Sequence, residues 1–414
     1  MAAAGSIKIV PAFATRPTMT ETQRIPGRRF LHSPGPTHVP DEVVHAISRQ
    51  PMDMGDPRLD RTIAAVENGL RRLLQTEAAD VFAYATNGHG AWEAVIANLV
   101  GPGQTVLVPG TGHFSEAWAA QTEGMGGKVI RTPWVEGLPI DADGVEKVLR
   151  ADSAHEIVAV FAVHTDTASG ITSDMQALRA AIDAARHPAL FVVDVVASLA
   201  AAPFAMDALR ANVVLGASQK GLMCPPGLGF VAADSRAMEV CNSNPAPRFY
   251  WDWRLRKSEF SYRKFCGTPP QTLLAGLEAA LDLIFQEGVE QVWARHRLVA
   301  NMVHAAVQCW SEAGALQFFG LVPGTRSTSV TAVQVRPGVD PEALRTVARE
   351  RFQVSVAGGL GPLNGRVFRI GHLGDMNPAM LLGCLAGLEA AMTVQGIPYG
   401  AGAMDAAIAC LARG

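Results

Sequence analysis

The sequence predicts an α/β protein with a mostly parallel sheet in its larger domain. Apolar, β-branched runs at residues 157–163, 190–193 and 213–215 are each too short for a helix and end in polar residues. Residues 173–186, between the first two runs, have a helical pattern. This alternation is typical of strand–helix–strand units with right-handed crossovers, in which the strands run parallel. A further strand at 229–233 could be antiparallel.

The composition indicates a soluble globular protein. Of the 414 residues, 49% are hydrophobic and 18% are charged, and the formal net charge is -3. This charge gives no reason to expect nucleic acid or an anionic membrane as a partner, and no apolar run reaches the ~18 residues that a membrane helix needs. Six cysteines without a CxxC pair indicate reduced thiols. The histidines show no HExxH motif or close ligand pair, so no metal site is expected.

The N-terminal segment allows two interpretations. Residues 1–30 carry four arginines, one lysine and a single acid, Glu21, as a transit peptide could. Pro11, Pro17 and Pro26 break its apolar pieces, which favours an N-terminal arm that could wrap a partner subunit. The expected location is then the cytoplasm.

An acid and an amine follow two of the predicted strands. Asp194 closes the run at 190–193, and Lys220 comes soon after the run at 213–215. If both strands belong to one parallel sheet, the two side chains lie at the same edge. A carboxylate there can hold a pyridine nitrogen protonated, and an amine among apolar neighbours can form a Schiff base with an aldehyde. From the spacing alone, a surface lysine and an ordinary strand-end aspartate remain the alternative.

The residues around this pair resemble a known family. Asp194-x-x-x-Ser198 is followed by GASQKG at 216–221 and by PPG at 225–227. These motifs resemble those of the class V pyridoxal-phosphate aminotransferases, in particular the alanine–, serine– and aspartate–glyoxylate branch. The resemblance covers most of the chain.

The resemblance implies a fold and a cofactor. The fold is that of type I pyridoxal-phosphate enzymes, with a large domain on a seven-stranded type of sheet and a small α/β domain. The cofactor is pyridoxal 5'-phosphate, with Lys220 as its Schiff-base lysine, Asp194 at its ring nitrogen and Gln219 as a further contact.

A glycine turn predicts an anion site. Residues 86–90, TNGHG, follow a predicted strand and lead into a helix, and amide groups at such a helix start attract anions. A helix start that Asn87 caps is the simpler explanation. The resemblance assigns the cofactor phosphate to Gly88 and His89.

Two more residues are expected beside the cofactor ring. By resemblance, Phe114 stacks on the ring and Thr167 places its hydroxyl near it, while Asp166 stands where relatives have a glutamate. His164, in the same run as Thr167, could instead be a hydrogen-bonded structural histidine. Trp92 and Trp118 are expected to fill the core.

The substrate contacts are also implied by the resemblance. A guanidinium fork pairs with a carboxylate in a way that lysine cannot, and relatives place such an arginine at Arg369. Without the resemblance, Arg369 would be interpreted as a surface or ion-pair residue. Residues 31–40, LHSPGPTHVP, predict an extended loop without ladder hydrogen bonds, which borders the substrate pocket in the family through Ser33 and Gly35.

The aromatic and basic run at 249–266 predicts an interface segment. In the resembling dimers, the Thr-Pro-Pro run that begins here at Thr268 reaches the partner's cofactor phosphate. A tyrosine usually stands three residues before it, where this chain has Phe265. We therefore expect a homodimer, with a tetramer as the alternative.

A long helical pattern begins at residue 288, and strand and helix patterns alternate after it. The expected parts are residues 1–45 as an N-terminal arm and substrate loop, 46–290 as the large cofactor-binding domain and 291–414 as the small C-terminal domain.

The predicted function is transamination from a small amino acid (serine, alanine or aspartate) to a small 2-oxo acid, with glyoxylate implied by the resemblance. The alternatives on the same fold are a pyridoxamine–pyruvate type of aminotransferase and a lyase or desulfurase. A dinucleotide-dependent oxidoreductase is disfavoured, because neither Gly110-x-Gly112 nor Gly359-x-Gly361 completes GxGxxG.

Overall fold

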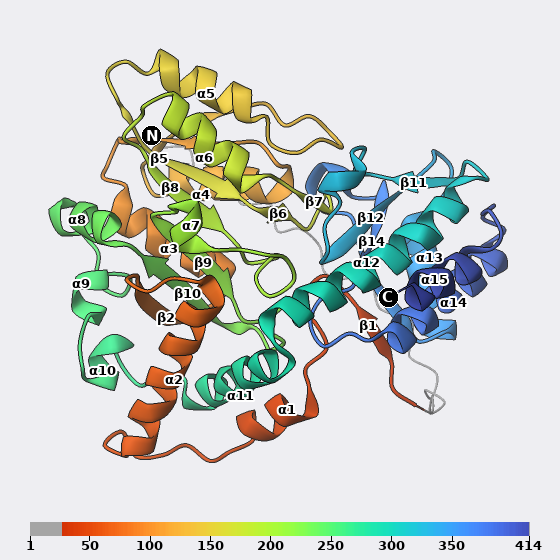
Figure 1. Ribbon diagram of the computed structural model, residues 1–414, viewed down its shortest axis with the longest axis horizontal. Helices are drawn as coiled ribbons and strands as arrows, with labels where there is room; N and C mark the ends of the chain where they lie inside the picture. Colours follow the sequence, from red (N-terminus) through yellow and green to blue (C-terminus); the bar gives the residue numbers. More distant parts are fainter. Residues whose placement is uncertain (1–26, 414) are drawn as a thin grey trace, which may run out of the picture.

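The computed structural model describes residues 27–413 and shows a larger and a smaller lobe, linked by the long helix α12 (Val289–Ser311) (Figure 1). The larger lobe holds a seven-stranded sheet and the smaller lobe a five-stranded sheet. Residues 1–26, in which an arm or a targeting segment is expected, lie outside the described residues.

The seven-stranded sheet has one antiparallel strand. Its order is β2-β10-β9-β8-β5-β3-β4, and only β10 runs against both of its neighbours. The carboxyl ends of β5, β8 and β9 therefore meet at one edge, as predicted. The strands are β2 (Asp80–Thr86), β3 (Thr105–Val108), β4 (Lys128–Arg131), β5 (Ile157–Val163), β8 (Leu190–Asp194), β9 (Val213–Ala217) and β10 (Gly227–Ala233).

Both faces of this sheet are buried. In β5, Val160 and Ala162 pack in one hydrophobic cluster, whereas Phe161 and Val163 pack in another. Because side chains alternate along a strand, the two clusters lie on opposite faces. Such a strand reads as one continuous apolar run, which explains why these strands stand out in the sequence.

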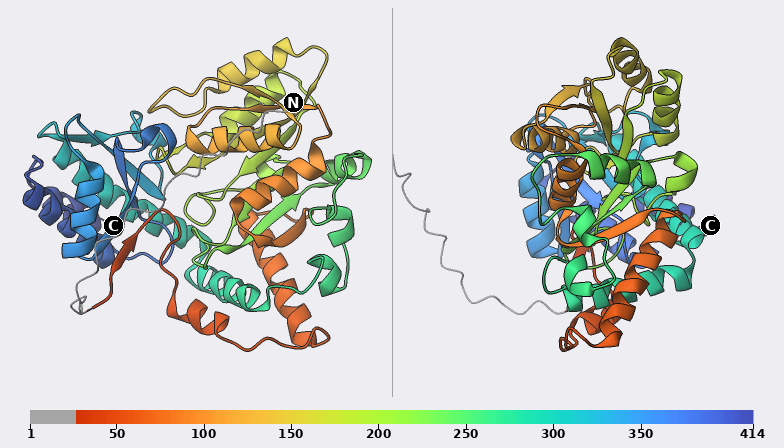
Figure 2. Two further views of the ribbon diagram at one scale, coloured as in Figure 1. Left: turned by 180° about the vertical axis from the view of Figure 1, so that it is seen from behind. Right: turned by 90° about the vertical axis from the view of Figure 1, so that its left-hand side faces the viewer.

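Helices cover both faces of the sheet (Figure 2). Their starts are capped where the sequence offers a short polar residue: Asp56 accepts from the amide of Arg58, and Asp174 accepts from the amides of Gln176 and Ala177. The helices of the large lobe are α1 (Asp41–Ile47), α2 (Pro57–Leu74), α3 (Gly88–Leu99), α4 (His113–Gly124), α5 (Ala142–Ala151), α6 (Met175–Ala184), α7 (Met206–Leu209), α8 (Ser235–Ser243), α9 (Trp253–Arg256), α10 (Ser261–Lys264) and α11 (Gln271–Glu287), and a small ribbon is formed by β6 (Thr165–Asp166) and β7 (Ile171–Thr172).

The small sheet has the order β1-β13-β14-β12-β11 and is antiparallel except for the pair of β1 with β13. Its strands are β1 (Phe30–His32), β11 (Leu316–Phe318), β12 (Val330–Val335), β13 (Val354–Gly358) and β14 (Val367–Gly371), accompanied by α13 (Pro341–Arg351), α14 (Pro378–Gln395), α15 (Ala403–Ala412) and the 3-10 turns η1 (Pro323–Thr325) and η2 (Gly361–Leu363).

The prediction that residues 31–40 form a loop without ladder hydrogen bonds is wrong at the start of this segment. Leu31 and His32 belong to β1, which pairs in parallel with Ser355 and Val356 of β13. Residues 33–40 lie outside helices and strands, as predicted, but residues 34–36 form a bend rather than an extended segment. Because the first of the three prolines is Pro34, nothing prevents the residues before it from joining a sheet edge. The domain boundaries at 45 and 290 stay predictions.

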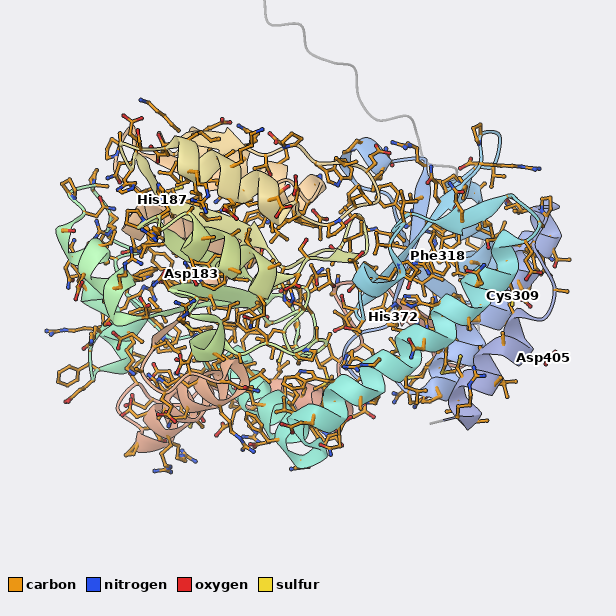
Figure 3. The ribbon with its side chains drawn as sticks, turned by 45° about the horizontal axis from the view of Figure 1, so that its top comes forward. Asp183, His187, Cys309, Phe318, His372 and Asp405 are labelled. Carbon is orange, nitrogen blue, oxygen red and sulfur yellow. The ribbon has the colours of Figure 1, made fainter. Side chains whose placement is uncertain are left out.

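Helix α12 carries the small lobe's core. Its C-terminal part packs on β11 and β12, and Figure 3 shows Phe318 and His372 beside it. Asp405 lies on α15, which also packs against α12 (Figure 3).

Helix α14 passes the length and hydropathy test for a membrane span, which the sequence analysis did not anticipate. Leu381, Leu385, Leu388 and Met392 of this helix pack in the small lobe's hydrophobic cluster. A core helix of a soluble protein meets the same test, so α14 carries no argument for a membrane.

Candidate active site

Seven residues predicted from the sequence line one cavity of about 150 Å³ at the carboxyl edge of the large sheet. They are Gly88, His89, Phe114, Thr167, Asp194, Gln219 and Lys220, and the rest of the lining comes from Asn87, Trp92, Val163, Thr165, Val196 and Ala197.

Lys220 enters this cavity from the turn after β9. Its amine Nζ donates to the Pro34 carbonyl oxygen at 2.5 Å. Burial and the nearby charge of Arg369 lower the pKa of Lys220 to about 8, against the opposite effect of Asp194 and Asp166. A neutral amine is therefore accessible close to neutral pH.

Asp194 ends β8, the strand next to β9 in the sheet. Burial raises the pKa of Asp194 to about 6, although two hydrogen bonds counteract this effect. Its Oδ1 accepts from the Val196 amide at 2.7 Å, and its Oδ2 accepts from the Trp92 indole Nε1 at 2.7 Å. The carboxyl group is thus held in one orientation.

Trp92 fills the core, as expected, and it also has a second role. Its indole stacks on Trp118, which in turn stacks on Phe161, as a core residue would. It also lines the cavity and binds Asp194. An apolar helix pattern places tryptophan in the core but gives no sign of where its N–H points.

The start of α3, where an anion site is expected, lies at this cavity. Asn87 Oδ1 accepts from the Gly90 amide at 3.3 Å, so the capping interpretation is right. Capping leaves the first-turn amides of Gly88 and His89 without helical acceptors, and both residues line the cavity. A side chain at position 90 would overlap the Thr86 hydroxyl, so this turn requires glycine.

Gln219 carries a buried polar atom that is not hydrogen-bonded within the described residues. Its Oε1 is buried and has no hydrogen-bond partner among the described residues. Buried polar groups are nearly always paired, so this side chain points to a polar ligand in the cavity.

Phe114 is fixed by Asp166. The carboxylate accepts from the Phe114 amide at 2.9 Å, from the Thr111 hydroxyl at 3.1 Å and from the Ala168 amide at 2.8 Å. Burial raises the pKa of Asp166. The shorter acid therefore holds the start of α4, and with it the aromatic ring.

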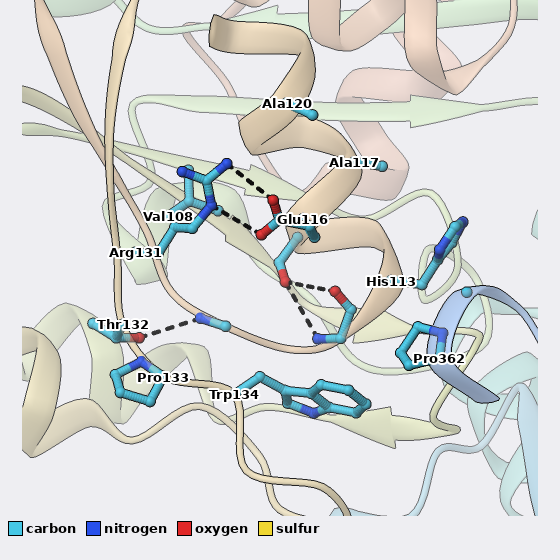
Figure 4. Close-up of a pocket in the computed structure, with 14 residues that line it drawn as sticks. Val108, His113, Glu116, Ala117, Ala120, Arg131, Thr132, Pro133, Trp134 and Pro362 are labelled. Carbon is cyan, nitrogen blue, oxygen red and sulfur yellow. Dashed lines mark hydrogen bonds and ion pairs between the residues drawn. The ribbon is translucent and has the colours of Figure 1, made fainter.

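A larger cavity lies on the other side of α4 (Figure 4). It has a volume of about 680 Å³, and His113, Trp134 and Pro362 are among its lining residues. Figure 4 also shows Arg131 of β4 bound to Glu116 of α4, which fixes the helix that carries Phe114. No residue of the predicted site lines this cavity.

Arg369 lies beside the predicted site without lining its cavity. Its Nη1 donates to the Thr167 carbonyl at 2.8 Å, and its Nε donates to the Gly358 carbonyl at 2.6 Å. Burial lowers the pKa of Arg369 to about 10, so it stays protonated at neutral pH. Arg369 and Ser33 line a separate, adjoining cavity of about 470 Å³.

Gly35 touches the reactive amine. Its φ is +132°, and a β-carbon there would overlap Lys220 Nζ. The Ser33 hydroxyl donates to the Gly35 carbonyl at 3.1 Å, which helps to shape this loop. The sequence did not reveal that Pro34, between them, would be the hydrogen-bond partner of Lys220.

Thr268 is not brought to the cavity of its own chain. It is exposed, whereas Phe265, three residues before it, packs in the large hydrophobic cluster. His164 is also outside the cavity: it is buried, and its Nδ1 pairs with the Ser198 hydroxyl at 2.9 Å. The structural interpretation of His164 therefore fits.

The comparisons with known proteins identify the family. Residues 29–363 match the family model described as aminotransferase class-V. The chain is 38% identical over 376 residues to an L-aspartate–glyoxylate aminotransferase of Paracoccus denitrificans, covering 90% of this chain and 93% of that protein. It is 34% identical over 400 residues to a serine–glyoxylate aminotransferase of Methylorubrum extorquens, covering 95% and 98%. A crystal structure of ureidoglycine–glyoxylate aminotransferase from Bacillus subtilis matches with a TM-score of 0.85 and 26% identity, covering 94% and 100%.

The chain therefore belongs to the class V aminotransferases, enzymes of fold type I that depend on pyridoxal 5'-phosphate. The cavity fits this cofactor: it offers an amine, a buried carboxyl group, a helix start for an anion and an unpaired polar atom at Gln219.

Replacing Gly35 by alanine should weaken cofactor binding about tenfold or more, because the new methyl group occupies the position of the Lys220 amine. Titration of the purified protein with pyridoxal phosphate measures this effect. Gly338→Ala is the matched control, since Gly338 also has a positive φ but has open space around it. Equal losses in both variants would contradict the role of Gly35.

Replacing Trp92 by phenylalanine should weaken cofactor binding about tenfold, because Asp194 loses its charge-assisted hydrogen bond while the ring packing is largely kept. The same titration measures it. Trp118→Phe serves as the control, because Trp118 is equally buried and does not bond to Asp194. If Trp118→Phe lost as much affinity, the indole bond would have no special role.

Proposed function

We propose that this chain transfers the amino group of a small amino acid, serine, alanine or aspartate, to a small 2-oxo acid, namely glyoxylate. The observation that carries the proposal is the shared cavity of Lys220 and Asp194, at the ends of adjacent strands. The two curated relatives described above are aspartate– and serine–glyoxylate aminotransferases, which supports the acceptor. These relatives do not favour the pyridoxamine–pyruvate, lyase or desulfurase alternatives.

The cofactor's place follows from the lining residues. Asp194 would pair with the ring nitrogen, Phe114 would stack on the ring and Thr167 would place its hydroxyl near it, since all three line the cavity. The amides of Gly88 and His89 would hold the phosphate, and Gln219 would make a further contact with the cofactor. The cofactor, when bound, draws electrons away from the α-carbon of the substrate.

Lys220 moves the proton. Its Nζ would take the proton from the α-carbon of the substrate and hold it for return, which an amine with a pKa of about 8 can do in both directions. Arg369 pairs with the substrate's α-carboxylate, and Ser33 and Gly35 border the substrate. These contacts fix which bond of the α-carbon lies next to Lys220.

We also propose a homodimer in which Thr268 donates to the partner's cofactor phosphate. Support comes from large exposed side chains near Thr268: Phe249 is 73% exposed, Phe260 is 67% exposed and Tyr262 is 59% exposed. Exposed aromatic groups of this kind are typical of an interface.

We also propose that the protein is located in the cytoplasm. The support is that prolines interrupt the apolar pieces of residues 1–26, which favours an N-terminal arm over a transit peptide.

Replacing Lys220 by alanine should remove the absorbance band of the bound cofactor near the visible edge and lower transamination at least a hundredfold, because both depend on the amine. An ultraviolet–visible spectrum and an assay with amino donors and glyoxylate measure the two effects. Lys257→Ala is the control, since Lys257 is an exposed lysine paired with Asp80. A protein that stays colourless after incubation with pyridoxal phosphate would overturn the proposal.

The rate at which cofactor-free enzyme captures pyridoxal phosphate should rise with pH and level off above about 8. Only the neutral amine attacks, and the pKa of Lys220 is lowered to about 8, so the neutral fraction grows as pH passes this value. Stopped-flow absorbance measures the profile. Arg369→Gln should shift the midpoint upward, because it removes a positive charge that lowers this pKa. A midpoint above 10 in the unmodified enzyme would contradict the burial of the amine.

A further inference from the structure

The cavity next to the cofactor site is rich in arginine. It has a volume of about 470 Å³, and its charged lining residues are Arg345, Arg349 and Arg369 together with one acid, Glu342. The excess of guanidinium groups favours an anionic occupant.

This cavity begins where the cofactor site ends. Arg369 lines it and also donates to the carbonyl of Thr167, which lines the cofactor cavity. Ser33 lines it too, directly before Pro34, whose carbonyl binds Lys220. A substrate whose α-carboxylate is bound by Arg369 therefore lies at the boundary of the two cavities.

Two of the arginines are held by carbonyls of the same strand. Arg345 Nε donates to Val356 at 2.9 Å, and Arg369 Nε donates to Gly358 at 2.6 Å. Carbonyls two residues apart lie on the same side of a strand and are separated by about 7 Å. The two guanidinium groups therefore lie near each other along β13, where burial, helped by the charge of Arg345, lowers the pKa of Arg369. Two neighbouring guanidinium groups suit the two carboxylates of a four- or five-carbon dicarboxylic acid.

Both guanidinium groups have donors left for such a ligand. Arg369 donates two of the five N–H groups of its guanidinium to backbone carbonyls. Arg345 donates its Nε to the Val356 carbonyl, and its Nη1 pairs with the Glu342 carboxylate. The Glu342 carboxylate thus occupies one side of Arg345 and competes with a ligand for it.

We propose that Arg345 binds the distal carboxylate of a dicarboxylic amino donor while Arg369 binds its α-carboxylate. This inference rests on the proposed function and narrows its donor: the chain prefers aspartate, or its five-carbon homologue, to alanine and serine. Arg349, at the exposed side of the cavity, attracts the anion without fixing it.

The test compares donors in the holoenzyme with glyoxylate as acceptor. Arg345→Gln should lower kcat/KM for aspartate about tenfold to a hundredfold and leave alanine and serine within about twofold, because only aspartate has a second carboxylate. Glu342→Gln should act in the opposite direction and lower KM for aspartate, since it frees Arg345 from its competitor. Succinate, which has no amino group, should bind the unmodified holoenzyme, and Arg345→Gln should weaken this binding by the same factor in calorimetry.

Arg351→Ala is the matched control, because it removes a positive charge from the same helix outside the cavity. Two results would overturn the inference: an equal loss for all donors in Arg345→Gln, or an unmodified enzyme that uses alanine or serine but not aspartate. In the second case transamination itself stands. An enzyme that uses no amino donor at all, although it binds the cofactor, would instead remove the proposed function.

Discussion

The structure depends on burying an amine and a carboxyl group at the ends of two adjacent strands. Burial acts against the charge of each, which lowers the pKa of Lys220 to about 8 and raises that of Asp194 to about 6. Neither group would be tolerated without partners, and both have them: the Pro34 carbonyl for Lys220 and the Trp92 indole for Asp194. The partners come from the N-terminal loop and from α3, so the site ties together segments that are far apart in the sequence.

The pattern of the large sheet was predictable because its causes are local. Strands that are buried on both faces have continuous apolar runs in their sequences. The residue that ends each run lies at the carboxyl edge of the sheet. The pattern therefore predicted that Asp194 and Lys220 lie at one edge if both strands belong to one sheet, and the resemblance to the family, rather than the spacing, gave the two residues their roles. The pairing of β1 with β13 has no such cause, since it joins residues about 320 positions apart in the chain and β1 is only three residues long.

Directions of single polar groups were also beyond the sequence. The helical pattern of α3 puts Trp92 toward the core, and only the packing shows that its N–H reaches Asp194. The resemblance suggested a longer acid, glutamate, at position 166, and the carboxylate of Asp166 holds the Phe114 amide. In both positions the residue type alone did not decide the role, because the backbone around it determines what the side chain can reach.

The small lobe adds an electrostatic link between substrate and amine. Arg369 is, after burial, the largest cause that lowers the pKa of Lys220, because two positive charges lie near each other in a buried site. When a carboxylate pairs with Arg369, it offsets that charge and makes Lys220 a stronger base. In the proposed function, the contact that orients the substrate therefore also prepares the amine to accept the proton, and it does so only when a carboxylate is in place.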